Sequence, residues 1–146
     1  MTSEYKPNFD LSGQVVLVTG PARGLGRASA LACAAAGADL VLGLRDKAKD
    51  GGLTAEIERM GRKVLPLQLD VLKIDQMKDG VNRALDQFGR IDVLVNNVGV
   101  GPENPAEKVT EEDFDFTVGA NLKGTFFMTQ TAVSYTHLTL PTNSLV

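Results

Sequence analysis

A glycine-rich turn follows an apolar segment near the start of the chain and precedes an alanine-rich segment. Residues 15–26 read V-V-L-V-T-G-P-A-R-G-L-G, and residues 27–36 favour a helix. An apolar run without alternation is typical of a strand buried on both faces of a parallel sheet. This order of strand, turn and helix predicts a site for the pyrophosphate of a dinucleotide, held by amides and the dipole at the helix N-terminus.

The spacing of these glycines, G-x-x-x-G-x-G, differs from the more familiar G-x-G-x-x-G of dinucleotide sites. A glycine triplet is weak evidence by itself, because any tight turn between a strand and a helix can contain glycines. Residues further along the chain therefore have to decide between a nucleotide site and a plain turn.

The bulk properties of the 146-residue chain are those of one globular domain, since 43% of its residues are hydrophobic. Its net charge of −3 and its scattered basic residues give no electrostatic footprint for nucleic acid. The apolar runs are too short to cross a membrane and the N-terminus has no secretory signal, so we expect a cytoplasmic protein. Cys33 is expected in the core, and one cysteine with one histidine cannot form a conventional zinc site.

Strands and helices alternate along the chain. The hydrophobic pattern predicts further strands at 39–44, 63–69 and 91–95 and helices at 53–60 and 74–88. Pro66 conflicts with the third strand, because proline cannot donate a ladder hydrogen bond, although an edge strand tolerates it. Alternation with short links predicts an α/β fold with a doubly wound parallel sheet, Rossmann-like, whose ligands bind beyond the carboxyl ends of the strands.

The last part of the domain is expected to contain a loop and two helices. Residues 100–108 include two prolines and are expected to form a loop over the substrate side. Thr110 is expected to cap a helix that has acidic residues in its first turn. Asn121 is expected to open a separate helix at residues 122–132.

Four motifs in this order resemble those of the short-chain dehydrogenase/reductase family. Residues 19–26 resemble its T-G-x-x-x-G-x-G cofactor turn, and Asp70–Val71 resembles the pair that flanks the adenine. Residues 96–99, N-N-V-G, resemble its N-N-A-G strand end, with Val98 in place of the alanine. Asn121 stands at the position of the family's catalytic asparagine. The resemblance implies a hydride-transferring oxidoreductase that uses a nicotinamide cofactor.

The cofactor site that this resemblance implies combines the glycine turn with the ends of three later strands. Amides of the turn would contact the pyrophosphate, Asp70 would accept from the adenine amino group, Val71 would pack on the adenine ring, and Asn97 would meet the ribose. Taken singly, Asp70 also fits a plain turn, and the Asn pair fits an Asx turn. The candidate residues are Gly20, Ala22, Arg23, Gly24, Leu25, Gly26, Arg45, Asp70, Val71, Asn97, Val98 and Gly99.

Two arginines favour NADP over NAD. Family members that use NAD generally have a carboxylate at the end of the second strand, where this chain has Leu44. Arg45 and Arg23 could instead both bind a 2′-phosphate with charge-assisted hydrogen bonds. The alternative is a solvated Arg45 that pairs with Asp46 or Asp50.

The sequence changes character after Ala132. Residues 133–142, V-S-Y-T-H-L-T-L-P-T, lack helical periodicity and read like the translated reverse strand of a transposon-end sequencing adapter, and residues 143–146 fit the rest of that adapter. We therefore expect residues 1–132 to be a dinucleotide-binding domain truncated at its C-terminus. Residues 133–146 are then a read-through tail that carries no information about the fold.

The family's mechanism uses a serine, a tyrosine, a lysine and an asparagine, of which this chain retains Asn121. Ser134 and Tyr135 come too soon after Asn121, and no lysine stands four residues after Tyr135, so we reject both, together with His137. The fragment alone is therefore expected to be inactive.

Further expectations concern the parent protein and the fragment. The resemblance implies a small carbonyl or alcohol substrate, of the 3-oxoacyl or sugar and polyol type, and a homotetramer. The alternatives are a non-catalytic NADP(H) sensor and a fragment that cannot fold stably because a sheet edge and a helix face are uncovered.

Overall fold

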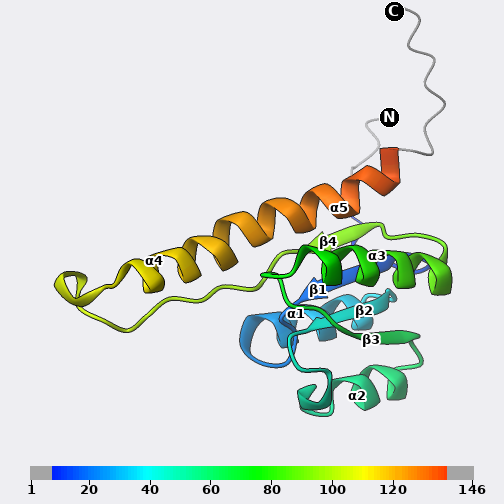
Figure 1. Ribbon diagram of the computed structural model, residues 1–146. Coiled ribbons are helices and arrows are strands. Elements are labelled where there is room, and N and C mark those ends of the chain that lie inside the picture. The colour runs from blue at the N-terminus through cyan, green and yellow to red at the C-terminus, as the bar shows by residue number, and fades with distance from the viewer. Residues whose placement is uncertain (1–7, 138–146) are drawn as a thin grey trace, which may run out of the picture.

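A single parallel sheet forms the centre of the computed structural model, which describes residues 8–137. Within these residues the sheet has four strands in the order β3-β2-β1-β4, shown in Figure 1. The strands are β1 (Val15–Thr19), β2 (Asp39–Leu44), β3 (Val64–Gln68) and β4 (Val93–Val95). The doubly wound sheet predicted from the sequence is confirmed, and β3, which contains Pro66, lies at an edge.

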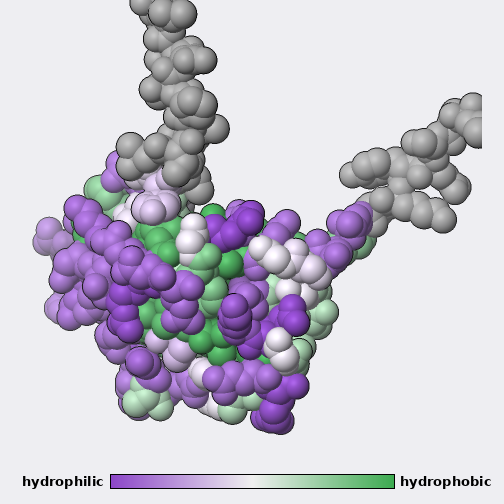
Figure 2. Space-filling model, turned by 90° about the vertical axis from the view of Figure 1, so that its right-hand side faces the viewer, coloured by the Kyte–Doolittle hydropathy of each residue, from purple (hydrophilic) through white to green (hydrophobic). Residues whose placement is uncertain are grey.

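Helices connect the strands and cover both faces of the sheet. They are α1 (Gly24–Ala35), α2 (Leu53–Arg59), α3 (Ile74–Phe88), α4 (Glu111–Val118) and α5 (Thr125–His137). Two short 3₁₀ turns, η1 (Lys47–Lys49) and η2 (Ala106–Lys108), and one π turn, η3 (Gly119–Gly124), complete the described elements. Figure 2 shows one face of the molecule, where polar residues surround apolar residues at the centre.

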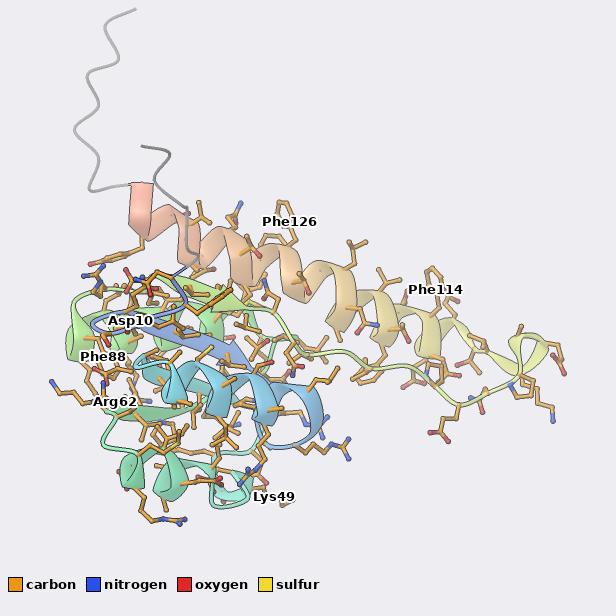
Figure 3. The ribbon with its side chains drawn as sticks, turned by 180° about the vertical axis from the view of Figure 1, so that it is seen from behind. Asp10, Lys49, Arg62, Phe88, Phe114 and Phe126 are labelled. Atoms are coloured by element: carbon orange, nitrogen blue, oxygen red, sulfur yellow. The ribbon has the colours of Figure 1, made fainter. Side chains whose placement is uncertain are left out.

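The elements α4, η3 and α5 follow one another without a break and form the long helix of Figure 1. Thr110 caps its start as predicted, in a capping box with Asp113. The prediction that a separate helix opens at Asn121 was wrong, because the chain passes this point through the π turn. Figure 3 shows Phe114 and Phe126 on the side of the long helix that faces away from the sheet.

The prediction that the helix ends at Ala132 was also wrong, since α5 continues to His137. Ser and Thr side chains within this helix bond back to carbonyls of the preceding turn, which is how their hydroxyl groups are satisfied in a helix interior. Ser134 Oγ donates to the carbonyl of Gln130 at 2.7 Å, and Thr131 Oγ1 donates to that of Phe127 at 2.7 Å. The expected tail lies outside the described residues from position 138 onward.

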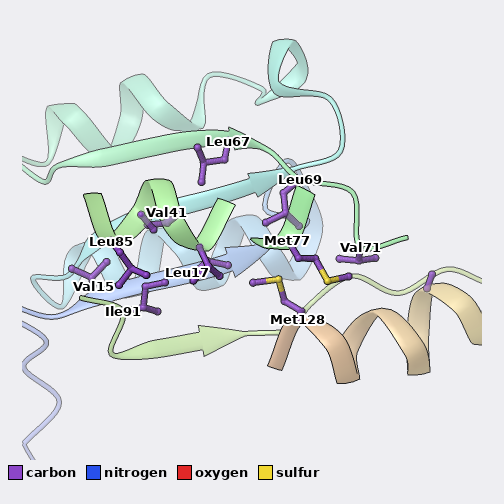
Figure 4. Close-up of a cluster of buried hydrophobic side chains, with 13 residues drawn as sticks. Val15, Leu17, Val41, Leu67, Leu69, Val71, Met77, Leu85, Ile91 and Met128 are labelled. Carbon is purple, nitrogen blue, oxygen red and sulfur yellow. The ribbon is translucent and has the colours of Figure 1, made fainter. Parts of the chain in front are cut away.

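Two apolar clusters lie on opposite faces of the sheet. Val16 and Val18 of β1 pack in the cluster that includes residues of α1 and α2, whereas Leu17 belongs to the other cluster. Figure 4 shows this second cluster, to which α3 contributes Met77 and α5 contributes Met128. Burial on both faces explains why β1 is an uninterrupted apolar run.

Candidate nucleotide-binding site

The glycine turn joins β1 to α1 and lies against the end of β4. A Cβ added at Gly20 would lie 2.9 Å from Val98 Cγ2, and one added at Gly26 would lie 2.5 Å from the Gly20 carbonyl oxygen and closer still to Asn97 Nδ2. Gly20 also has a positive φ of 66°. Larger residues at Gly20 and Gly26 would therefore separate the ends of the two strands.

The outer side of the same turn is open, and its residues fit an anionic cofactor. A Cβ at Gly24 would meet no atom within 4 Å. Arg23 provides no side-chain cap for α1, and the first turn of α1 contains no acidic residue. By contrast, α4 has a capping box and three acidic residues in its first turn. The uncapped amides and positive dipole end of α1 are suited to a pyrophosphate.

The positions of the other turn residues agree with this arrangement. Ala22 packs partly against the cluster under α1 and α2, whereas Leu25 is 82% exposed at the start of α1. The backbone of Ala22 also approaches the segment before α2, because a Cβ at Gly51 would lie 3.4 Å from the Ala22 carbonyl oxygen.

Thr19 and Asn97 connect the ends of β1 and β4. Asn97 Nδ2 donates to the carbonyls of Thr19 at 3.1 Å and Gly20 at 3.0 Å. Thr19 Oγ1 accepts from the backbone N–H of Asn97 at 3.1 Å, and this side chain is only 1% exposed. Asn97 Oδ1 accepts no hydrogen bond from residues 8–137, so it remains available to a ribose hydroxyl.

Sequence reasoning missed the role of Thr19, although a threonine at the end of a buried apolar strand is a signal for it. The neighbouring Asn96 bonds in another direction, since its Nδ2 donates to Thr129 Oγ1 of α5 at 2.9 Å. Both asparagines thus bond to other elements, and the described hydrogen bonds include no Asx turn made by either side chain. Gly99, two residues after Asn97, is exposed at the start of the following loop.

Asp70 and Val71 follow the end of β3. Asp70 Oδ1 accepts from the backbone N–H of Leu72 at 3.0 Å, so this residue does form a local turn. Its backbone N–H donates to Gln76 Oε1 at 2.9 Å, while Oδ2 has no hydrogen bond within the described residues. Val71 is only 7% exposed and lies against Gly124, whose Cβ would come within 2.8 Å of the Val71 carbonyl oxygen.

Arg45 follows β2, and its side chain is exposed. Asp46, a possible partner, instead forms an ion pair with Lys49 at 3.2 Å and accepts from the Ala48 N–H at 3.1 Å. These hydrogen bonds, that from Lys49 first, hold the pKa of the Asp46 carboxyl below its ordinary value.

The other possible partner of Arg45 is also engaged elsewhere, since Asp50 accepts from the backbone N–H groups of Gly52 and Thr54. Neither Arg45 nor Arg23 forms an ion pair in the part of the chain that the structure describes. Both guanidinium groups are exposed to solvent in the structure, and the described residues show no group that contacts both of them.

Asn121 lies in the π turn, and its side chain closes the loop that follows β4. Its Oδ1 accepts from the Val100 N–H at 2.8 Å, and its Nδ2 donates to the Val100 carbonyl at 2.7 Å. Tyr135 lies 14 positions later, about 20 Å along a helix that rises 1.5 Å per residue. Ser134 and Tyr135 are therefore not brought to Asn121, and the side chain of His137 is outside the described set.

No group of three metal-ligating side chains occurs between residues 8 and 137. In the same range, no helix is long and apolar enough to span a membrane.

Comparisons with known proteins identify the family to which this chain belongs. The family model described as short chain dehydrogenase matches residues 14–138. The 3-oxoacyl-acyl-carrier-protein reductase FabG of Thermotoga maritima is 41% identical over 125 residues, covering 86% of this chain and 51% of that protein. The 2-dehydro-3-deoxy-D-gluconate 5-dehydrogenase of Escherichia coli is 38% identical over 127 residues, covering 87% and 49%. The chain thus spans about half the length of these relatives.

A solved structure gives the same result for the fold. The short chain dehydrogenase from Burkholderia cenocepacia J2315, determined in complex with NADP, superposes with a TM-score of 0.80 at 33% identity. The match covers 85% of this chain and 51% of that one.

Proposed function

Because this chain belongs to the short-chain dehydrogenase family, we propose that it is the cofactor-binding half of an NADP-dependent oxidoreductase. The observation that carries the proposal is the uncapped N-terminus of α1, open above Gly24 and placed beside Asn97 at the carboxyl edge of the sheet. This edge is where ligands bind to doubly wound sheets.

The described residues have distinct parts in this proposal. Amides of residues 22–26 hold the pyrophosphate, the free oxygen of Asp70 accepts from the adenine amino group, and Asn97 Oδ1 accepts from a ribose hydroxyl. Val71 offers the adenine only an edge, because it is nearly buried. When bound, the cofactor supplies or accepts a hydride at a carbonyl or alcohol carbon.

The preference for NADP rests on charge and on the absence of a competing ion pair among residues 8–137. Arg45 and Arg23 are exposed, and the carboxylates nearest Arg45 in sequence are engaged by Lys49 and by backbone amides. A similar structure holds NADP. Guanidinium groups bind phosphate with strong, directional hydrogen bonds, so a 2′-phosphate is the group we assign to Arg45.

The substrate class is proposed from the names of the relatives. Their names include a 3-oxoacyl reductase and a sugar-acid dehydrogenase, so we propose a small carbonyl or alcohol substrate of one of these types. We also propose a cytoplasmic homotetramer for the parent protein.

The fragment itself is proposed to be inactive, with residues 133–146 as a read-through tail. The side chain of Asn121 is hydrogen-bonded to the backbone of Val100, and Ser134 and Tyr135 lie far from it along the helix. We therefore expect no NADPH-dependent turnover by the purified chain on a panel of carbonyl compounds, and turnover would contradict this. The second candidate is an NADP(H) sensor, favoured if the uninterrupted coding sequence lacks a serine followed by Tyr-x-x-x-Lys.

The test of cofactor choice is a binding titration of the 146-residue chain with NADPH and NADH. Arg45→Ala should weaken NADPH binding roughly tenfold, about the contribution of one charge-assisted hydrogen bond, and leave NADH binding unchanged. Arg83→Ala is the matched control, since Arg83 is a half-exposed arginine of α3 paired with Asp79. Equal affinity of the wild-type chain for both cofactors would contradict the NADP assignment.

A further inference from the structure

Gln68 links the edge strand β3 to the loop that carries Arg45. It is the last residue of β3 and lies in register with Leu44, the last residue of β2. Its side-chain Nε2 donates to the carbonyl of Arg45, and its Oε1 accepts from the backbone N–H of Lys47 at 3.1 Å. One amide side chain thus holds both ends of the Arg45–Lys47 segment. We propose that Gln68 is a positioning residue for selectivity toward a 2′-phosphate, an inference that rests on the proposed function.

Gln68 is the side-chain anchor of the loop after β2 in the part of the fold that the structure describes. Within residues 8–137, no other side chain from outside the loop bonds to the backbone of residues 45–49. The remaining bonds are internal: Asp46 accepts from the Ala48 N–H and pairs with Lys49. Without Gln68, the loop would keep its small 3₁₀ turn but lose its fixed position beside β3.

The position of this loop decides where its positive charges lie. Arg45, Lys47 and Lys49 are all exposed. The one acidic side chain of residues 45–49, Asp46, is held by Lys49 and an amide, which reduces its repulsion of a phosphate. A loop ordered before binding loses less entropy when it binds, so its affinity for the ligand is higher. Gln68 therefore raises 2′-phosphate affinity through Arg45 without touching the ligand.

Gln76 is the matched control, because it positions a different part of the same site. Its Oε1 accepts from the backbone N–H of Asp70 at 2.9 Å, which fixes the adenine-side turn. Loss of Gln76 should weaken every adenine ligand by the same factor. Loss of Gln68 should weaken only ligands that carry a 2′-phosphate, since the pyrophosphate and adenine contacts lie on α1 and Asp70.

The experiment is a calorimetric titration of the 146-residue chain with 2′,5′-ADP and with 5′-AMP. Both probes use only contacts within the described residues. The wild-type chain should prefer 2′,5′-ADP, Gln68→Met should reduce this preference roughly 3- to 10-fold, and Gln76→Met should leave it unchanged. Gln68→Ala is a second variant, and circular dichroism verifies that each variant is folded.

A second readout needs no ligand. The Lys47 amide should exchange with deuterium faster in Gln68→Met than in the wild-type chain, and at the wild-type rate in Gln76→Met. An unchanged ligand preference in both Gln68 variants, with the wild type still preferring 2′,5′-ADP, overturns the inference and leaves the proposed function standing. A wild-type chain that shows no preference for 2′,5′-ADP overturns both.

Discussion

Gly124 shows how a single missing side chain can position part of the candidate site. A Cβ at this position would lie 2.8 Å from the Val71 carbonyl oxygen and 3.1 Å from Val71 Cβ. Gly119, at the other end of the same π turn, differs, because its Cβ would meet only the Cδ2 atom of Leu72 at 3.3 Å. Backbone atoms cannot move aside as a leucine methyl can. Of these two glycines, only Gly124 is therefore required by packing.

We predict opposite effects of alanine at these two glycines. Gly124→Ala should lower the free energy of unfolding by about 1–3 kcal/mol, the usual cost of overpacking. Gly119→Ala should leave it unchanged or raise it by up to about 1 kcal/mol, because alanine favours helical backbone over glycine. Urea unfolding of both variants measures the difference. Stabilisation by both substitutions would show that Val71 does not press on the π turn.

Asp92 fixes the register between β4 and β1 at the element scale. It lies just before β4, donates its backbone N–H to the Val15 carbonyl at 2.9 Å and accepts the Val15 N–H on Oδ2 at 2.8 Å. Burial raises the pKa of the Asp92 carboxyl. Hydrogen bonds from Arg90 and Val15 and the positive charge of Arg90 lower this pKa, and their combined effect is larger than that of burial. The net pKa is below the ordinary value of an aspartate.

This direction predicts a loss of stability in acid. A carboxyl whose pKa is lower in the folded state contributes stability above its unfolded pKa of about 4, and that contribution disappears as the pH falls through the folded value. Urea midpoints measured between pH 6 and pH 3 should therefore fall less steeply for Asp92→Asn than for the wild type. Asp86→Asn, an exposed aspartate of α3, controls for the charge change. Equal slopes for Asp92→Asn and the wild type would contradict the prediction.

The sequence predicted the elements well where local signals mark their ends. The ends of β2 and α3 agree with the prediction. Gly37 ends α1 just before β2, Gly89 ends α3, and the apolar residues of both elements follow a clear period. The π turn was missed, since an added residue in a helix leaves no periodic signature. Asn121 was therefore placed at a helix start and not inside a longer helix.

The candidate site was predicted only in part, for a related reason. The order of strands and turns shows which residues reach the carboxyl edge, and the glycine turn follows from that order. Thr19 bonds to the end of β4, Gln68 to the loop after β2, and Gln76 back to Asp70 six residues earlier. Hydrophobic periodicity shows none of these pairings, so the specific partners came from the structure. A polar residue within an apolar strand, such as Gln68, is the signal that could have indicated its role.

At the scale of the whole molecule, the long helix leaves large apolar side chains in solvent. Phe114, Leu122 and Phe126 are 61%, 68% and 59% exposed. Phe114 and Phe126 are 12 positions apart, and because the π turn absorbs one residue, the remaining 11 make about three turns. The two rings therefore share one side of the helix, as Figure 3 shows. Exposed apolar surface of this kind marks a protein interface.

We predict that this surface mediates self-association, as expected for a chain whose parent we propose to be a homotetramer. The free edge of β4 also remains open in the described sheet, so association can involve more than the helix. Replacing Leu122 and Phe126 by serine removes apolar area from the helix alone and should shift sedimentation velocity profiles toward the monomer. Leu25→Ser removes an even more exposed leucine from the glycine turn and should leave the profiles unchanged. A wild-type chain that stays monomeric at the highest soluble concentration would contradict the prediction, whereas association that persists in the double variant would assign it to the edge of β4.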